Sequence, residues 1–267
     1  MYTSSTSPEA LRLYHLGGRT FECGVRSTLD EARGYFERSI DIDPTFARAK
    51  SWLAYTLVEG WSYGWYPDCD RTLADELADQ ALELDEGDYQ NHWTKAVVLK
   101  SSGQIADAET AFNMSRTLRT AQASEDPDLL VEMAEVLGYQ GKHDEAIDSI
   151  HEAIEMKANV RAGDQTVRVP HPDWYMWFLA MQLYFVNEYQ RSLYELAKMT
   201  ELPNNAYLLQ AANYYRLDEQ DLAEEEMATH QAREPDWTVS KEKAVEHFQD
   251  NDMQHWLDAL QGAGLPP

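Results

Sequence analysis

Small and apolar residues recur along this chain at intervals of four and then three positions. Ala32, Phe36 and Ser39 show the spacing clearly, and mostly polar or charged residues stand between them. Residues four and three apart lie on one face of an α-helix, so each triplet predicts a helix with one buried side. Six such helices are anchored at Ala32, Ala74, Ala108, Ala146, Ser192 and Ala223, of which Ser192 is the weakest match.

A second amphipathic segment precedes each anchored helix. It carries a small residue, such as Ala96, at a place where two helices can cross closely. Gly103 and Gly141 fall in the turns between paired segments, where a left-handed backbone is needed. Pro44 and Pro235 end two of the anchored helices. The pattern predicts an all-α protein of consecutive helix pairs, and the uneven spacing of the anchors indicates insertions.

These residues resemble the tetratricopeptide repeat, and the segment 89–122 matches that repeat without insertion. The resemblance implies a right-handed α-solenoid of about six helix pairs that forms a single superhelical domain over residues 1–267. The repeat anchors then lie near positions 32, 74, 108, 146, 192 and 223. A terminal helix within about 239–262 is expected to cap the open end of the stack, because its apolar residues recur at helical spacing. These apolar residues are Phe248, Met253, Trp256, Leu257 and Leu260.

A narrower resemblance rests on two segments, FERSIDIDPTFARAKSWLAYTL and LVEGWSYGWYPDCDRTLADELADQALELD. They look like the repeat region attached to many bacterial class III adenylate or guanylate cyclases and to some winged-helix regulators. This resemblance covers nearly the whole chain and brings no catalytic residues with it. It implies a bacterial regulatory module that captures a partner.

In this repeat family the first helix of each pair lines the concave groove. Placing the family pattern on the sequence puts Arg48 and Ser51 among the groove residues, together with a dense aromatic segment that begins at His171. Trp and Tyr are enriched among binding hot spots, so Trp174, Trp177 and Tyr184 are expected to form an aromatic floor. Packing of these rings against the neighbouring repeat or the cap is the alternative. The residues predicted to bind a partner are Tyr55, Trp93, Lys100, Trp174, Trp177, Met181, Tyr184 and Tyr215.

The charge pattern narrows the kind of partner. The formal net charge is −25, from 22 Lys and Arg against 47 Asp and Glu. Such a surface repels nucleic acid and anionic lipid, so neither is expected as a partner. It fits a basic or amphipathic protein or peptide, although solvated acidic helix faces explain it equally. Homo-oligomerisation through the aromatic residues is a further possibility.

Motifs for catalysis and metal binding are missing from the sequence. The eight histidines show no HExxH pattern, and no phosphate-binding or nucleophile-elbow motif occurs. No catalytic residue, metal site or cofactor is therefore predicted. A binding scaffold is favoured over an enzyme, and the alternative is a small-molecule sensor or enzyme with a pocket between the groove and the long loops.

Cysteine use and hydropathy predict a cytoplasmic protein. Cys23 and Cys69 show no metal-type spacing, and two reduced thiols fit that compartment. No apolar run approaches the roughly 18–20 residues that cross a bilayer. The first residues lack a basic segment followed by an apolar one, as a signal peptide would have.

Overall fold

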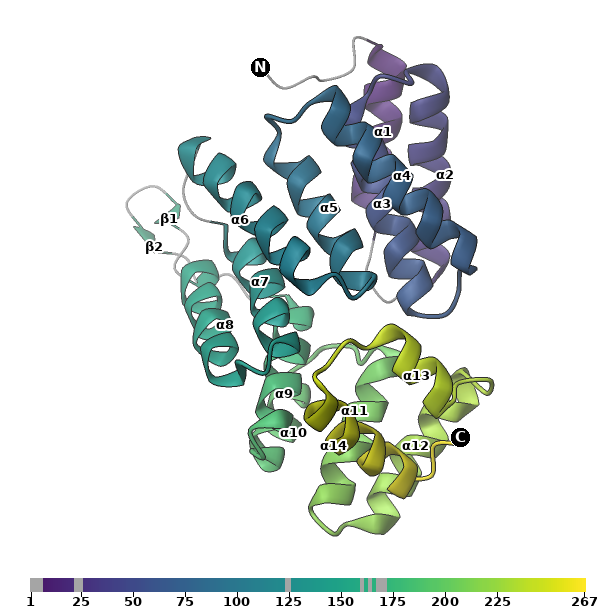
Figure 1. The fold of residues 1–267 in the computed structure, drawn as a ribbon, viewed down its shortest axis with the longest axis vertical. Coiled ribbons are helices and arrows are strands. Elements are labelled where there is room, and N and C mark those ends of the chain that lie inside the picture. Colours follow the sequence, from purple (N-terminus) through teal and green to yellow (C-terminus); the bar gives the residue numbers. More distant parts are fainter. Residues whose placement is uncertain (1–6, 22–25, 123–125, 159–160, 163–164, 167–171) are drawn as a thin grey trace. The chain divides into compact units, whose positions relative to one another are not determined.

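The computed structural model describes residues 7–21, 26–122, 126–158, 161–162, 165–166 and 172–267. These residues form fourteen helices and one two-stranded hairpin (Figure 1). The chain divides into two compact units, unit 1 at Met1–Asp126 and unit 2 at Pro127–Pro267. Each unit is described by itself, and the single domain over residues 1–267 stays a prediction.

Unit 1 consists of three helix pairs. The pairs are α1 (Pro8–Thr20) with α2 (Arg26–Ile42), α3 (Ala47–Ser62) with α4 (Asp68–Leu84), and α5 (Tyr89–Ser101) with α6 (Ile105–Gln122). The first helix of each following pair packs on the pair before it, since α3 contacts α2 and α5 contacts both α3 and α4. This stacking of consecutive hairpins confirms the predicted all-α repeat fold in this unit.

Unit 2 continues the same design with three more pairs. They are α7 (Pro127–Tyr139) with α8 (His143–Ala158), α9 (Asp173–Phe185) with α10 (Tyr189–Leu196), and α11 (Asn204–Arg216) with α12 (Gln220–Arg233). A short hairpin of β1 (Arg161–Ala162) and β2 (Gln165–Thr166) follows α8. Two more helices, α13 (Val239–Val245) and α14 (Asp250–Gly262), end the chain, and α14 packs on α11.

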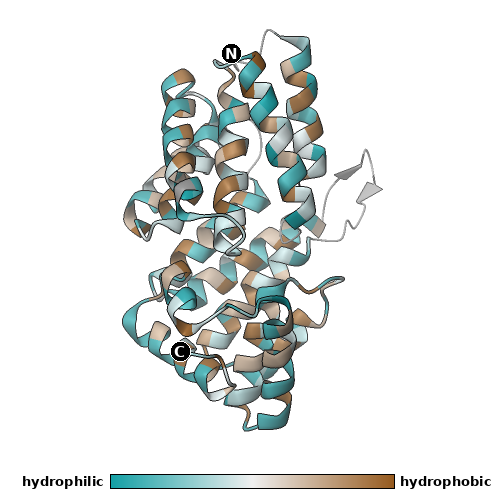
Figure 2. Ribbon diagram, turned by 90° about the vertical axis from the view of Figure 1, so that its right-hand side faces the viewer, coloured by the Kyte–Doolittle hydropathy of each residue, from teal (hydrophilic) through white to brown (hydrophobic). Residues whose placement is uncertain are grey.

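The predicted anchors form the core of the helix pairs. All six, Ser192 included, are fully buried at the start of the second helix of their pair. Each faces a small residue on the first helix, and these small residues are also buried. Apolar and polar residues alternate along the helices, as expected when only one side of each is covered (Figure 2). The small residues are Gly17, Ala54, Ala96, Ala134, Ala180 and Ala211.

A left-handed residue closes the turn inside four of the pairs. Gly103 and Gly141 have φ near +73°, and Asn187 and Asp218 take the same conformation with φ of 62° and 59°. All four stand seven positions after the small residue of their first helix. The sequence predicted the two glycines and missed the other two, although Asn and Asp are the residues that tolerate this conformation best after glycine.

In three of the pairs, a side-chain hydrogen bond joins the second helix to the start of the first. Ser39 Oγ donates to the carbonyl of Ala10 over 2.8 Å, and Ser115 Oγ donates to that of Tyr89 over 2.9 Å. In the last pair the His230 ring takes this place, with Nδ1 3.1 Å from the carbonyl oxygen of Asn204. These bonds satisfy carbonyl groups that are buried between the helices.

Candidate partner-binding faces

Four aromatic side chains touch one another in turn across the first helices of unit 1. We call Phe21, Trp52, Tyr55 and Trp93 the aromatic row. The ring centroids are 5.4 Å apart for Phe21 and Trp52, 6.0 Å for Trp52 and Tyr55, and 4.6 Å for Tyr55 and Trp93. Tyr55 is buried, while the other three are half-buried. The row thus offers a partly exposed aromatic edge that joins the end of α1 to α3 and to the first half of α5.

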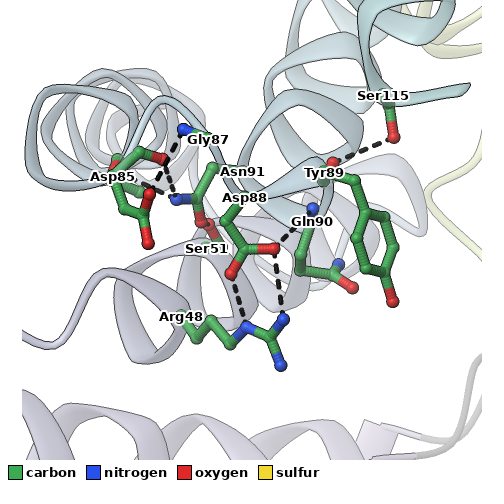
Figure 3. A network of polar contacts seen from close by, with 10 residues as sticks. Arg48, Ser51, Asp85, Gly87, Asp88, Tyr89, Gln90, Asn91 and Ser115 are labelled. Carbon is green, nitrogen blue, oxygen red and sulfur yellow. Dashed lines mark hydrogen bonds and ion pairs between the residues drawn. The ribbon is translucent and has the colours of Figure 1, made fainter. Parts of the chain in front are cut away.

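A polar network lies at the junction of α3 and α5, the helices that carry Trp52, Tyr55 and Trp93 (Figure 3). Arg48 Nε and Nη2 donate to the two oxygens of Asp88, over 2.5 and 3.2 Å. Asp88 in turn caps α5 by accepting a hydrogen bond from the backbone N–H of Gln90. Burial acts to lower the pKa of Arg48, but the hydrogen bonds and charge of Asp88 outweigh it and raise the pKa. The paired charges therefore fix α3 against α5.

The position of Ser51 differs from the prediction. Ser51 is fully buried and donates to Asn91 Oδ1 over 2.6 Å, so it belongs to the junction between helices rather than to the groove. Trp52, the next residue, lies on the aromatic row instead. The family pattern missed Trp52 because a shift of one residue on a helix turns a side chain by about 100°.

The first helices of unit 1 carry an excess of basic side chains, six against two acidic ones. The acidic excess of the unit lies on α4, which carries six acidic side chains and one arginine, whereas α2 and α6 are nearly balanced. Lys100 stands half-buried near the end of α5. The charged residues of the first helices are Arg12, Arg19, Arg48, Lys50, Lys95 and Lys100, with Glu9 and Glu59.

In unit 2, two predicted groove residues lie at the start of α9. Trp174 and Trp177 are both half-buried. Trp174 packs edge-on against Tyr175 at 4.5 Å, and Trp177 packs edge-on against Phe178 at 5.0 Å. The indole Nε1 of Trp177 is buried without a hydrogen-bond partner among the described residues. These two tryptophans thus combine packing with partial exposure.

The other three predicted residues of unit 2 do not form an open surface. Tyr184 is fully buried and Met181 is 4% exposed, so the expected aromatic floor does not extend to them. Trp256 of α14 packs edge-on against the Tyr184 ring at 5.3 Å. Tyr215 is half-buried and lies so close to α14 that a Cβ at Gly262 would come within 2.2 Å of its ring. The C-terminal helix therefore covers this part of the predicted groove.

Two further aromatic side chains, at and just after the end of α3, are buried in unit 1. Trp61 Nε1 donates to Asp68 over 3.0 Å, and Tyr66 Oη donates to Asp30 over 2.9 Å. The side chains of Cys23 and Cys69 lie outside what the structure describes.

Two further properties concern the described residues only. Among them, no three His, Cys, Asp or Glu side chains are grouped so that they could hold a metal ion. No helix in that part of the chain combines the length and the hydropathy needed to cross a bilayer.

Comparison with solved structures identifies the fold. The structure of Pseudomonas aeruginosa PilF matches 88% of this chain and 96% of its own, with a TM-score of 0.52 and 15% sequence identity. That of PilW, a type IV pilus biogenesis factor, matches 87% of this chain and 96% of its own, with a TM-score of 0.57 and 14% identity. The APC/C hetero-tetramer Cut9–Hcn1 gives a TM-score of 0.60 at 18% identity, over 89% of this chain and 46% of that one.

The fold is thus that of tetratricopeptide-like helix pairs, in agreement with the sequence resemblance. At these identities the likeness shows the fold alone. Neither a protein-family model nor a curated protein matches the sequence.

Proposed function

We propose that this protein is a binding scaffold that holds a protein or peptide partner on the first helices of unit 1. The observation that carries the proposal is the aromatic row, in which Phe21, Trp52 and Trp93 are partly exposed and supported from below by buried Tyr55. Large rings that stay exposed do not contribute to folding stability, since burial of such a side chain stabilises a protein by roughly 1.5–3 kcal/mol. Rigid, half-buried Trp and Tyr side chains are the usual anchors of protein interfaces.

The proposed partner is an amphipathic helix whose apolar side covers the aromatic row. An apolar strip supported by fixed polar pairs suits the helix-in-groove mode of recognition. The overall charge of −25 favours a basic partner at long range. The cations of the first helices, Arg48 and Lys100 among them, favour acidic flanks close to the row. Binding of positively and negatively charged peptides therefore distinguishes a basic partner from one with acidic flanks.

A regulatory role is an extension of this proposal. It rests on the sequence resemblance to repeat regions of class III cyclases and winged-helix regulators, on which the three matched structures do not bear. Trp174 and Trp177 extend the proposal to unit 2, where they would supply a separate aromatic contact for a partner of the same kind.

The test uses fluorescent 18-residue amphipathic helical peptides, one series flanked by Lys and one by Glu. Their binding to the full chain is measured by fluorescence anisotropy at low and moderate salt. The informative variant is Trp93→Ala, and the matched control is Trp65→Ala, which removes a half-buried aromatic ring of the same unit that stacks on Tyr63 away from the row. A Trp174→Ala/Trp177→Ala variant tests the extension to unit 2. Circular dichroism establishes that all the variants are folded.

At least one peptide series is expected to bind wild type and the Trp65→Ala variant alike. Binding to Trp93→Ala should be at least about tenfold weaker, as for loss of a hot-spot residue. A charge-assisted complex also weakens as salt rises. Equal losses in the two variants, or no binding of either series to wild type, would overturn the proposal.

A further inference from the structure

The C-terminal part of unit 2 fills groove positions of the same unit. We call residues 246–262 the C-terminal strap. Its helix α14 packs on α11, with Gly262 against the Tyr215 ring, and it also reaches α9 through the contact of Trp256 with Tyr184. Trp256, Leu257 and Leu260 are buried in this contact. The strap therefore lies as an amphipathic helix against two first helices.

Polar contacts fasten the strap to these two helices. The carbonyl of His255 accepts a hydrogen bond from Tyr184 Oη over 3.2 Å and another from the Arg216 guanidinium. Tyr184 and Arg216 stand near the ends of α9 and α11. Burial raises the pKa of Tyr184 above its usual value, which keeps its hydroxyl a donor.

The beginning of the strap crosses to the first pair of unit 2. Asp252 Oδ2 lies 3.1 Å from Nε2 of His143, whose ring also stacks on Phe185 with centroids 4.9 Å apart. Gln249 Nε2 donates to the carbonyl of Gln140 over 2.6 Å, and Tyr139 Oη lies 3.1 Å from Glu246 Oε2. The strap thus touches the ends of α7, α9 and α11 in turn, and its first half combines these polar bonds with Phe248, whose ring packs against Tyr139 and Phe185 at 5.2 and 4.6 Å.

Some of the covered positions have partly exposed counterparts in unit 1. Tyr184 and Tyr215 each stand four residues after the small crossing residue of their helix, and so do Phe21, Val58 and Lys100 in unit 1. Phe21 and Lys100 are half-buried, whereas Val58 is 3% exposed. Among the described residues of unit 1, no helix that corresponds to α14 packs on α1, α3 and α5. The counterparts on α1 and α5 therefore stay partly accessible, while the chain's own helix covers those on α9 and α11.

We infer that the ends of α9 and α11 form a helix-binding site that the strap occupies as an internal ligand. A partner that competes with the strap should resemble it. We expect an amphipathic helix with an aromatic residue and, four positions later, an aliphatic one, like Trp256 and Leu260. The hydrogen bond between His143 and Asp252 controls the fraction of molecules in which the strap is detached from this site. This inference is independent of the aromatic row in unit 1.

The first experiment measures binding in trans. The probe is a fluorescent synthetic peptide with the sequence of residues 249–265, titrated into the full chain. The opening variant is Asp252→Ala, which removes the strap's side of this hydrogen bond and leaves His143 in place for Asp252 of the peptide. The control is Glu195→Ala/Lys198→Ala, which removes an ion pair of 2.6 Å between α10 and the residue two positions after its end. If Asp252→Ala does not fold, Asp252→Asn takes its place.

A hydrogen bond to a charged group contributes enough that its loss should raise the open population about tenfold. Apparent affinity follows the open fraction, so the peptide should bind the opening variant about tenfold more tightly than wild type. The control should bind as wild type does. Equal affinity for the opening variant and wild type would overturn the inference, as would no binding to either.

Hydrogen exchange on the same full-length proteins separates opening from unfolding. Amides of α14 should exchange about tenfold faster in the opening variant, while those of α12 should keep the wild-type rate. If α12 and α14 accelerate together, the strap is an inseparable part of the core and the inference is wrong.

Discussion

The Ser51 hydroxyl donates a hydrogen bond of 2.6 Å to Asn91 Oδ1, and both side chains are fully buried between α3 and α5. Asn91 Nδ2 also donates to the carbonyls of Ala81 and Asp85, over 3.1 and 2.8 Å (Figure 3). Asn91 thus ties α3, the end of α4 and the start of α5 together. Because no water reaches this junction freely, removal of one member leaves its partners unsatisfied.

We therefore expect Asn91→Ala to lower the free energy of unfolding by about 2–4 kcal/mol, because it leaves the Ser51 hydroxyl and the Asp85 carbonyl without this partner and removes one of the two bonds to the Ala81 carbonyl. Ser51→Ala leaves only one acceptor unpaired and should cost about 1–2 kcal/mol. Chemical denaturation followed by circular dichroism measures both. Equal costs for the two variants would show that the network does not hold this junction.

Two adjacent glycines of α1 should respond in opposite directions. A Cβ at Gly17 would lie 2.6 Å from Cε1 of Phe36, whereas a Cβ at Gly18 meets nothing within 4 Å. Gly17→Ala must push α1 and α2 apart and should cost about 1–3 kcal/mol. Gly18→Ala adds helix propensity and should stabilise by up to about 1 kcal/mol. Thermal unfolding of the two variants beside wild type makes the comparison, and a destabilised Gly18→Ala would contradict it.

Because the Glu242 carboxyl group is buried, we expect its contribution to stability to decrease as pH rises. Its carboxylate accepts hydrogen bonds from Trp237 Nε1 and Trp256 Nε1, over 2.7 and 2.8 Å, and it is 3% exposed. Burial raises the pKa of Glu242 above the ordinary 4.5, although the two indoles act to lower it. As pH rises, the Glu242 carboxyl group therefore loses its proton in the unfolded chain at a lower pH than in the folded protein. The stability that this group contributes should fall from pH 4.5 upward, through the raised pKa.

Glu242→Gln does not titrate, and its amide can accept only one indole N–H. The variant should be less stable than wild type at pH 4.5, and the gap should narrow as pH rises. Urea unfolding monitored by tryptophan fluorescence between pH 4 and 8 measures the gap. A gap that widens with pH would show that the two indoles outweigh burial.

His230 should make unit 2 sensitive to acid. Its Nδ1 bonds the carbonyl of Asn204, and its Nε2 is buried without a partner among the described residues. Burial lowers the pKa of His230 below the ordinary 6.5. The unfolded chain therefore takes up a proton before the folded one does, so stability is greatest above pH 6.5 and falls as pH drops toward the lowered pKa.

The test is His230→Ser, which places at this position the residue that Ser39 and Ser115 supply in other pairs. The smaller side chain leaves a cavity and should cost about 1–3 kcal/mol at every pH. The loss of stability between pH 6.5 and 5 should, however, be smaller than in wild type. An unchanged pH dependence would mean that His230 can be protonated in place.

Much of the fold was accessible from residue spacing. The four-then-three spacing recurs at the anchors, and in four pairs the small crossing residue precedes the anchor by twelve positions and precedes the turn residue by seven. A helix pair has few ways to bury such faces. The groove was harder to predict. Tyr55 and Trp93 contact each other, but Ser51 points into the junction and Trp52 lies on the row in its place. Insertions shift the register by one residue, and the sequence contains no signal that fixes it.

The sequence by itself determined the helix pairs, their order and the residues between them, because these depend on local periodicity and on contacts between neighbours along the chain. Only the tertiary structure decided which aromatic residues stay accessible. Trp93 and Tyr184 are both candidate groove residues in the pattern, yet Trp93 is half-buried and Tyr184 is fully buried in contact with α14. Coverage depends on where a segment 71 positions away along the chain settles, as the bond from Tyr184 to the carbonyl of His255 shows. No local period encodes such a long-range contact, since it results from the fit of one amphipathic helix to the ends of two others.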